Sequence, residues 1–190
     1  MGSRARQPAG EGQGTPRPRA RVLDAIVVRP VRPEECTEAG RQTRAGFAAL
    51  YGEGDVEYLD AVADVAGRIG RATVLVALDG ERILGSITVE LNTKLDPAQQ
   101  LAPGEAHLRM LGVAPAAQGR GAGRALLEGA ATLARTEGKC RLTLRTLPEM
   151  VAARRLYEAM GFQGGTPEEH APGRVHMSYE LQLRAGAPPV

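Results

Sequence analysis

The chain has 190 residues, enough for one domain with a core but short for two, and hydrophobic residues make up 43% of it. Aromatic residues make up only 3% and Trp is absent, so the core must be built from Val, Leu, Ile and Ala. Residues 1–21 hold five arginines and one glutamate, so subtraction from the net charge of +2 leaves the remaining chain at about −2. A basic tail on a mildly acidic body is not a usual nucleic-acid-binding surface, and we expect no nucleic-acid partner.

The two ends of the chain have little to bury. Residues 1–21 are rich in Gly, Pro, Arg and Gln and are expected to be a disordered basic tail, as are residues 185–190, which leaves one domain at 22–184. No apolar run approaches the ~18 residues that span a bilayer, and no apolar stretch follows the N-terminal arginines as in a secretory signal. Cys36 and Cys140 lack metal-site or redox spacing and are expected as two buried thiols in a reducing compartment. The sequence therefore predicts a cytoplasmic protein with no membrane partner.

The first half of the domain predicts a strand, two helices and a hairpin. A short apolar strand at 26–28 ends at prolines, and a helical stretch runs from Glu34 to about Leu50. Apolar residues at three- and four-residue spacing from Leu59 to Ile69 predict an amphipathic second helix. Two β-branched runs, 73–78 and 83–91, flank an Asp-Gly pair that suits a tight hairpin turn.

The second half predicts four strands and two helices. Residues 106–113 form a strand, and residues 121–137 predict a helix with Leu and Ala on one side. A strand is expected at 141–147, a helix at 149–160, an extended stretch from Phe162, a loop at 164–173 and a last strand at 175–183. The order β-α-α-β-β-β-α-β-α-β-β predicts an α/β (α+β) fold, with a mixed, mostly antiparallel central sheet of about seven strands flanked by four helices.

One segment carries chemistry. In LGVAPAAQGRGAGRALL, residues 111–127, a strand runs into a turn with Gly119, Gly121 and Gly123, and the turn opens a helix. Glycines let the backbone come close to a ligand, and the free N–H groups and dipole of a helix's first turn form an anion site. Arg120 and Arg124 add charges that could pair with phosphate. The turn therefore predicts a bound pyrophosphate.

Other glycine turns also hold phosphates. A Walker A loop ends in Gly-Lys-Ser/Thr, whereas this turn ends in Gly-Arg-Ala. A Rossmann fingerprint would follow the first strand of the domain, whereas this turn lies past the middle of the chain. From the turn alone, a helix N-terminus without a ligand stays open.

Two motifs in order resemble the GNAT family of N-acetyltransferases. Leu-x-Val-x-Pro followed by Gln-x-x-Gly-x-Gly and an amphipathic helix resembles the family's coenzyme A segment, and ARRLYEAMGF, residues 153–162, looks like its A-x-x-L-Y-x-x-x-G-F helix. The element order also matches, so the resemblance covers roughly residues 22–183. It implies a GNAT-like acyl-CoA N-acyltransferase that moves an acetyl group from acetyl-CoA to a primary amine by direct attack in a ternary complex, without a metal.

The resemblance also implies the cofactor contacts. The backbone of the strand before the turn would pair with the pantetheine arm of acetyl-CoA, and the amides of the turn would hold the pyrophosphate. The expected cofactor-binding residues are Leu111, Gly112, Val113, Gln118, Gly119, Arg120, Gly121, Ala122, Gly123 and Arg124. The family commonly has an Asn seven residues before its helix tyrosine, whereas this chain has Met150, which removes one expected contact.

By the same resemblance, Tyr157 occupies the position of the frequent general acid, which protonates the leaving thiolate of coenzyme A. The alternative is a tyrosine that only packs or hydrogen-bonds the cofactor's sulfur. The family's general base falls at His107, and Glu105 lies two residues earlier on the same face of the strand. His107, Glu105, a water molecule or an acceptor that arrives deprotonated all stay open.

The acceptor is expected to enter between the first two helices and the last two strands. Carboxylates there would favour a cationic amine, a small molecule or a peptide side chain; ordinary solvated loops are the alternative. These carboxylates are Glu53, Asp55, Glu57, Glu168 and Glu169. A homodimer is an expectation from the family. Two other classes remain: a non-catalytic acyl-CoA-binding regulator, and a nucleic-acid-associated protein acting through its tail.

Overall fold

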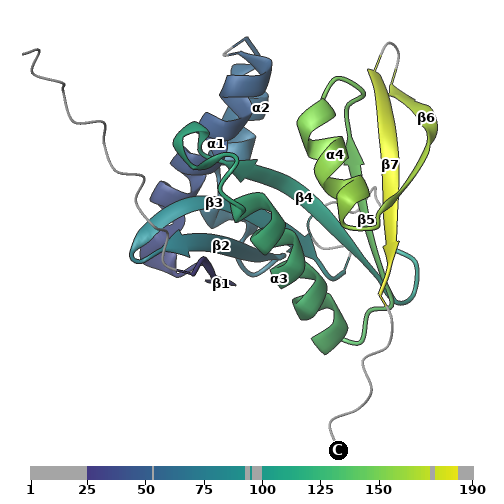
Figure 1. Ribbon diagram of the computed structural model, residues 1–190, viewed down its shortest axis with the longest axis horizontal. Coiled ribbons are helices and arrows are strands. Elements are labelled where there is room, and N and C mark those ends of the chain that lie inside the picture. Colours follow the sequence, from purple (N-terminus) through teal and green to yellow (C-terminus); the bar gives the residue numbers. More distant parts are fainter. Residues whose placement is uncertain (1–24, 53, 93–94, 96–99, 172–173, 184–190) are drawn as a thin grey trace, which may run out of the picture.

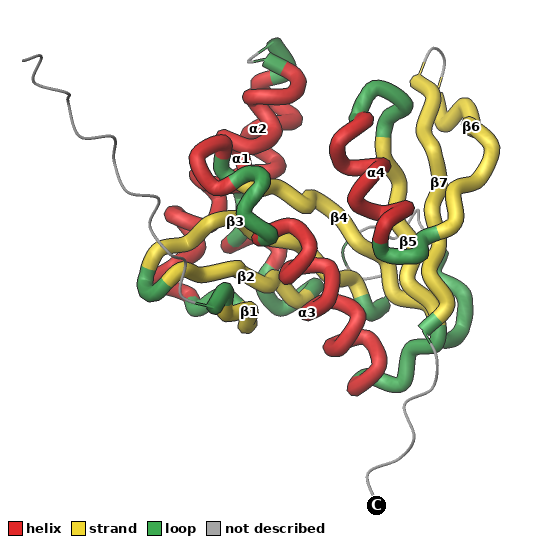
Figure 2. Tube along the Cα trace, in the orientation of Figure 1, coloured by secondary structure: helices red, strands yellow, loops and turns green. Residues whose placement is uncertain are grey.

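The computed structural model describes residues 25–52, 54–92, 95, 100–171 and 174–183. Its central element is a seven-stranded sheet in the spatial order β1-β2-β3-β4-β5-β7-β6 (Figures 1 and 2). The strands are β1 (Val27–Pro30), β2 (Thr73–Asp79), β3 (Arg82–Glu90), β4 (Glu105–Val113), β5 (Arg141–Thr146), β6 (Gln163–Ala171) and β7 (Arg174–Gln182). The helices are α1 (Cys36–Tyr51), α2 (Val56–Ala63), α3 (Ala122–Thr136) and α4 (Val151–Ala159). This confirms the predicted mixed, mostly antiparallel sheet with four helices.

The helices lie on both faces of the sheet. Alternation along β2 shows the division, because Leu75 and Ala77 pack in the cluster that includes α3, whereas Val74 and Val76 pack with residues of α1. Helices α1 and α2 therefore cover one face of the first half of the sheet, and α3 covers the other. Helix α4 packs beside the second half, on the same side as α3 (Figure 1).

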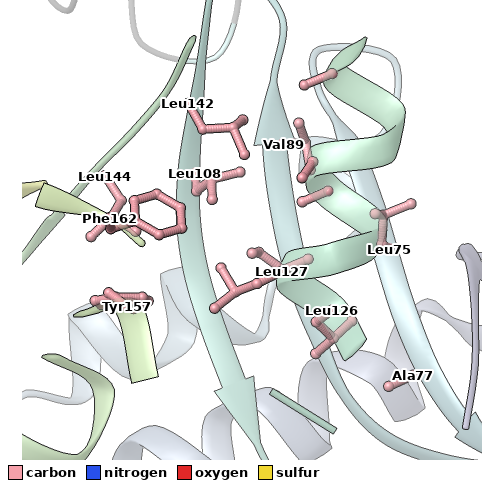
Figure 3. Packing of buried hydrophobic residues seen from close by; sticks show 14 of the residues in the cluster. Leu75, Ala77, Val89, Leu108, Leu126, Leu127, Leu142, Leu144, Tyr157 and Phe162 are labelled. Atoms are coloured by element: carbon pink, nitrogen blue, oxygen red, sulfur yellow. The ribbon is translucent and has the colours of Figure 1, made fainter. Parts of the chain in front are cut away.

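The main core lies between α3 and the sheet. Leu126 and Leu127 of α3 are 0% and 1% exposed, and they lie against Leu108 of β4 and Leu75 of β2 (Figure 3). Complete burial of one leucine contributes about 1.5–3 kcal/mol. This core is aliphatic, as the composition predicts, and it fixes α3 across the strands that lead to the glycine turn.

Strands β4 and β5 form the one parallel pair among the described strands, and they soon separate. Their pairing runs from Glu105↔Arg141 to Leu108↔Leu144, while β4 continues for five more residues. On its other edge β4 contains a bulge, because the register with β3 shifts between Thr88↔Arg109 and Ser86↔Gly112. Met110, inside the bulge, has a φ of 52°, which a non-glycine residue rarely adopts. The sheet thus opens between β4 and β5, as Figure 1 shows.

Three details differ from the sequence prediction. The second helix ends at Ala63 rather than near Ile69, because the Asp64 carboxylate accepts a hydrogen bond from the Gly67 N–H and turns the chain. The predicted loop at 164–173 is largely strand β6, which pairs with β7 despite its polar sequence. Both cysteines are free, but Cys140 is exposed rather than buried. The predicted tails at 1–21 and 185–190 lie outside the described residues.

Helix α1 approaches β4 closely enough to require glycine at the contact. A Cβ added to Gly46 would lie 2.5 Å from the Val113 carbonyl oxygen, and one added to Gly112 would lie 2.7 Å from a methyl carbon of Thr43. Backbone atoms cannot move aside as the end of a flexible side chain can. The register of α1 on β4 therefore depends on these two glycines.

We expect Gly46→Ala to lower the free energy of unfolding by about 2 kcal/mol, since overpacking outweighs the gain in helix propensity. Urea denaturation monitored by circular dichroism measures the change. Gly54→Ala is the matched control, because a Cβ there meets no atom within 4 Å and the φ of Gly54 is not positive. A Gly46→Ala variant as stable as the control would contradict this account of the α1 contact.

Candidate functional site

The glycine turn leads from β4 into α3. Gly119 and Gly121 have φ angles of 73° and 91°, which favour glycine, and Gly121 is the N-cap residue of the 15-residue helix. No side chain caps the first-turn amides. The Gln118 side chain instead donates to the Val113 carbonyl oxygen at 3.2 Å and ties the turn back to β4. The first-turn N–H groups of α3 are therefore available to an anion.

The two arginines of the turn have different surroundings. Arg120 lies 3.5 Å from the Asp79 carboxylate of the β2–β3 hairpin, and its side chain is 27% exposed. Arg124 lies 3.8 Å from Glu128 one turn along α3, and both side chains are at least half exposed. Exposed pairs of this kind contribute little. Of the two predicted phosphate partners, Arg124 is the one that can turn toward a ligand at small cost.

A cavity of about 670 Å³ occupies the opening between β4 and β5. It begins where the parallel pairing stops, and α1, α2, α3, α4 and β7 also contribute to its wall. Among the lining residues are Phe47, Asp55, Tyr58, His107, Leu108, Arg109, Met110, Leu111, Leu127, Arg145, Glu149, Met150, Tyr157 and His176. Leu127 lies one helical turn after Gly123, so the cavity and the glycine turn are adjacent along α3.

The predicted pantetheine-binding residues lie on this stretch of β4. Leu111 lines the cavity, whereas a Cβ on Gly112 would meet Thr43 and Phe47 of α1. The backbone of residues 109–113 has no β5 partner in the described pairing, because β5 pairs only as far as Leu108. An extended ligand could therefore pair with the open edge of β4 and reach the turn at Gln118.

Tyr157 projects from α4 into the cavity and is 6% exposed. Its ring centroid lies 5.8 Å from those of Phe162 and Tyr179, and Figure 3 shows it beside Phe162 and Leu144. Burial raises the pKa of the Tyr157 phenol above its ordinary value, and the neighbouring Tyr179 and Tyr58 add to the effect. The hydroxyl therefore keeps its proton at neutral pH.

Helix α4 is fixed to β7 through one hydroxyl group. The Tyr179 hydroxyl accepts from Arg154 Nε at 3.1 Å and donates to Glu158 Oε1 at 2.9 Å. Arg154 also donates to the Pro148 carbonyl oxygen at 2.9 Å. Since Arg154 and Glu158 flank Tyr157 on α4, this network fixes the helical turn that carries the phenol.

The two candidate bases lie together on β4, as their spacing predicts. His107 is 3% exposed, and its Nδ1 lies 2.8 Å from Thr143 Oγ1 of β5. Glu105 accepts from Thr143 Oγ1 at 2.7 Å and from Arg141 at 2.8 Å. Both residues line a second cavity of about 410 Å³ over β5 and β7. His107 also lines the larger cavity with Tyr157, and Glu105 does not.

Some residues that line a cavity or pair with a lining residue were given no site role by sequence reasoning. Glu90 is 0% exposed and accepts from Arg109 Nε at 2.9 Å, yet it lies within an apolar run that gives no signal of a buried ion pair. Thr143 contacts both candidate bases, a role that only the β4–β5 register reveals. His176 on β7 also lines the larger cavity.

Met150 also lines the larger cavity, at the position where an Asn was expected. It is the N-cap residue of α4 but makes no capping hydrogen bond, and its sulfur accepts from Thr146 Oγ1 at 3.1 Å. The residue therefore supplies an apolar surface at the place of the missing amide contact.

The described ranges contain no candidate metal site and no candidate membrane-spanning helix. No group of three or more His, Cys, Asp or Glu side chains there is arranged to hold a metal ion. Within the same ranges, no helix is long and apolar enough to cross a membrane.

Comparison with known families gives one clear match. The model of the acetyltransferase (GNAT) family matches residues 42–162, which include the glycine turn, both candidate bases and Tyr157. No curated protein matches the chain.

Solved structures share the fold at low sequence identity. A protein of Desulfovibrio desulfuricans assigned to the GNAT acetyltransferases has a TM-score of 0.66 at 22% identity, over 84% of this chain and 99% of its own. YncA of Salmonella typhimurium, solved with acetyl-CoA, has a TM-score of 0.61 at 20% identity, over 88% and 99%. The PaiA N-acetyltransferase of Thermoplasma acidophilum, solved with coenzyme A, has a TM-score of 0.63 at 16% identity, over 83% and 100%.

Removal of the Tyr179 hydroxyl should lower the stability of the protein and leave the cavity in place. We expect Tyr179→Phe to lower the free energy of unfolding by about 1 kcal/mol, because one hydroxyl group makes two hydrogen bonds to charged side chains that remain partly solvated. Tyr157→Phe is the control, since the Tyr157 hydroxyl makes no hydrogen bond within the described residues and its removal should change stability by less than about 0.5 kcal/mol. Thermal denaturation that ranks the two variants in the opposite order would contradict the assigned network.

Proposed function

The chain belongs to the GNAT acetyltransferase family, and we propose that it transfers the acetyl group of acetyl-CoA to a primary amine by direct attack in a ternary complex. One observation carries the proposal: a single cavity, at the point where β4 and β5 separate, contains both Tyr157 and His107. A proton donor and a proton acceptor in one cavity are what acetyl transfer between sulfur and nitrogen requires.

The residues that precede and open α3 fit acetyl-CoA. The open edge of β4 at Leu111, Gly112 and Val113 offers backbone groups to the amides of a pantetheine arm. The amides of residues 119–123 would hold the pyrophosphate, with Arg124 as its cationic partner, whereas the Gln118 N–H already donates to the Pro115 carbonyl oxygen at 3.3 Å. We assign Arg120 instead to the hairpin, because it pairs with Asp79.

His107 is the better candidate for the base. It lines the cavity that contains Tyr157, whereas the Glu105 carboxylate is held by Arg141 and Thr143 in the second cavity. Because His107 is 3% exposed, it would take the proton of the amine through a bound water molecule. The amine nitrogen then has a lone pair for attack on the acetyl carbon.

Tyr157 would complete the reaction as the acid. As the new C–N bond forms and the C–S bond breaks, the phenol donates its proton to the departing sulfur. The raised pKa keeps the phenol protonated at neutral pH, and it also makes proton donation to a thiolate, which is a weaker base than this phenolate, the more costly step. As the amide forms, its nitrogen loses a second proton, which restores the phenol of Tyr157, and His107 releases the first proton to solvent. The products are the N-acetylated amine and coenzyme A.

The cavity wall supports a primary amine without selecting a strongly cationic one. Asp55 and Glu149 line it, but so do Arg109 and Arg145. Glu168 and Glu169 are exposed on β6 and do not line it, and Glu53 lies outside the described residues. We therefore do not propose the acidic entrance predicted from the sequence. We keep the proposal that the acceptor is a small-molecule or peptide amine. The predicted cytoplasmic location and homodimer remain predictions.

We expect Tyr157→Phe to lower kcat by roughly 100-fold to 1,000-fold, because the leaving thiolate loses its acid. The Kd for acetyl-CoA should change by less than about twofold, since the ring and its packing remain. Steady-state kinetics with an amine found by library screening, together with calorimetry, separate the two quantities. Arg135→Glu, a charge reversal at an exposed position in the last turn of α3, is the control with near-normal kcat. Unchanged kcat in Tyr157→Phe would leave the tyrosine only a packing role.

A further inference from the structure

Three side chains on β4 and β5 form a continuous hydrogen-bonded chain. Glu105 Oε1 lies 2.7 Å from Thr143 Oγ1, which lies 2.8 Å from His107 Nδ1. His107 and Thr143 are register partners across the parallel pair, so backbone hydrogen bonding on both strands holds the arrangement. Arg141 donates to the other oxygen of Glu105 at 2.8 Å and fixes that end of the chain.

The positions of the protons in this chain follow from the groups that form it. A carboxylate has no proton to give, so the Thr143 hydroxyl must donate its only proton to Glu105. The Thr143 oxygen can then only accept from the imidazole. His107 Nδ1 must therefore carry a proton, and in the neutral ring the lone pair lies on Nε2.

We propose that Thr143, held by Glu105, is a positioning residue that fixes His107 in the tautomer with the proton on Nδ1, so that Nε2 is the nitrogen that accepts the proton of the amine. The use of Nε2 in acetyl transfer rests on the proposed function; the tautomer does not. His107 and Glu105 are then not alternatives for the general base: His107 is the base, and Glu105 orients it through Thr143.

The chain also suits the charged state of the histidine. When Nε2 takes up a proton, Nδ1 still donates to Thr143, and no hydrogen bond needs to reverse. The positive imidazolium is then connected through one hydroxyl group to the Glu105 carboxylate, which stabilises it. Glu105 itself stays an acceptor throughout, which accounts for a carboxylate that lies near the reaction without lining the cavity of Tyr157.

The tautomer can be observed without any reaction. The sequence contains three histidines, so the full chain labelled with ¹⁵N-histidine gives three ring spin systems, and His107→Gln identifies the one that disappears. Long-range ¹H–¹⁵N correlation at a pH where the rings are neutral distinguishes a protonated from an unprotonated ring nitrogen. We expect Nδ1 of His107 to be protonated in the wild type and in Thr143→Ser, and the proton to move toward Nε2 in Thr143→Val.

Kinetics provide the second readout. Loss of the correct tautomer should lower kcat/KM in Thr143→Val by about 10-fold to 100-fold, with recovery to within about threefold in Thr143→Ser, which retains the hydroxyl group. Glu180→Gln is the matched control, because it removes the second carboxylate near Arg141, 3.6 Å away, and leaves the chain to His107 intact. Circular dichroism verifies that each variant is folded.

A wild-type His107 with its proton on Nε2, or a folded Thr143→Val variant with the wild-type tautomer, would overturn the inference whatever the activity. If Thr143→Val does not fold, the wild-type and Thr143→Ser spectra still decide the tautomer. Failure of the wild type to acetylate any amine would instead overturn the proposed function, since the spectra test the tautomer independently.

Discussion

The parallel contact between β4 and β5 ends at Leu108 and Leu144, and the separation beyond it determines what the rest of the molecule can do. The N–H and C=O groups of a paired strand are hydrogen-bonded to its neighbour, whereas the end of β4 leaves those groups unpaired, among the described residues, on the edge that faces β5. The bulge at Met110 and the close packing of α1 on Gly112 turn β4 away from β5. The cavity occupies the space that opens between the two strands. The proposed binding site therefore depends on the single parallel pair among the described strands.

The two halves of the sheet contribute different chemistry to that cavity. The first half brings the open edge of β4 and, through α3, the uncapped amides of the glycine turn. The second half brings Tyr157 on α4, which Tyr179 and Arg154 fix to β7. At the last paired positions of β4 and β5, Thr143 joins the candidate base to a carboxylate. The candidate base and the carboxylate thus lie where the strands are still paired, and the edge proposed to bind the ligand begins where they separate.

The sequence predicts the element order and the glycine turn because both are local properties. Positive φ angles require glycine at Gly119 and Gly121, and helical periodicity marks α3, so neither depends on distant residues. The extent of strand β6 beyond the extended stretch predicted from Phe162 could not be predicted, because Gly164 and Pro167 are poor strand formers that only pairing with β7 holds in place. The pairing of Arg120 with Asp79 and the contact of Thr143 with His107 join residues far apart in the chain, and they become visible only with the register of the sheet.

The central claim is that acetyl-CoA binds along β4 with its pyrophosphate at the start of α3, and isothermal titration calorimetry tests it most directly. The comparison is between the wild type, a Gly123→Glu, Arg124→Glu double variant, and an Arg135→Glu variant with the charge reversal at the far end of the same helix. First-turn glutamates suit the helix dipole, and the Cβ added at Gly123 would lie 3.1 Å from a terminal methyl carbon of Leu156, a flexible side chain that can shift, so the double variant should fold, which circular dichroism verifies. The account predicts micromolar binding by the wild type and the Arg135→Glu control, and binding at least about 100-fold weaker in the double variant. Equal affinity in all three proteins, or no binding by the wild type, would contradict it.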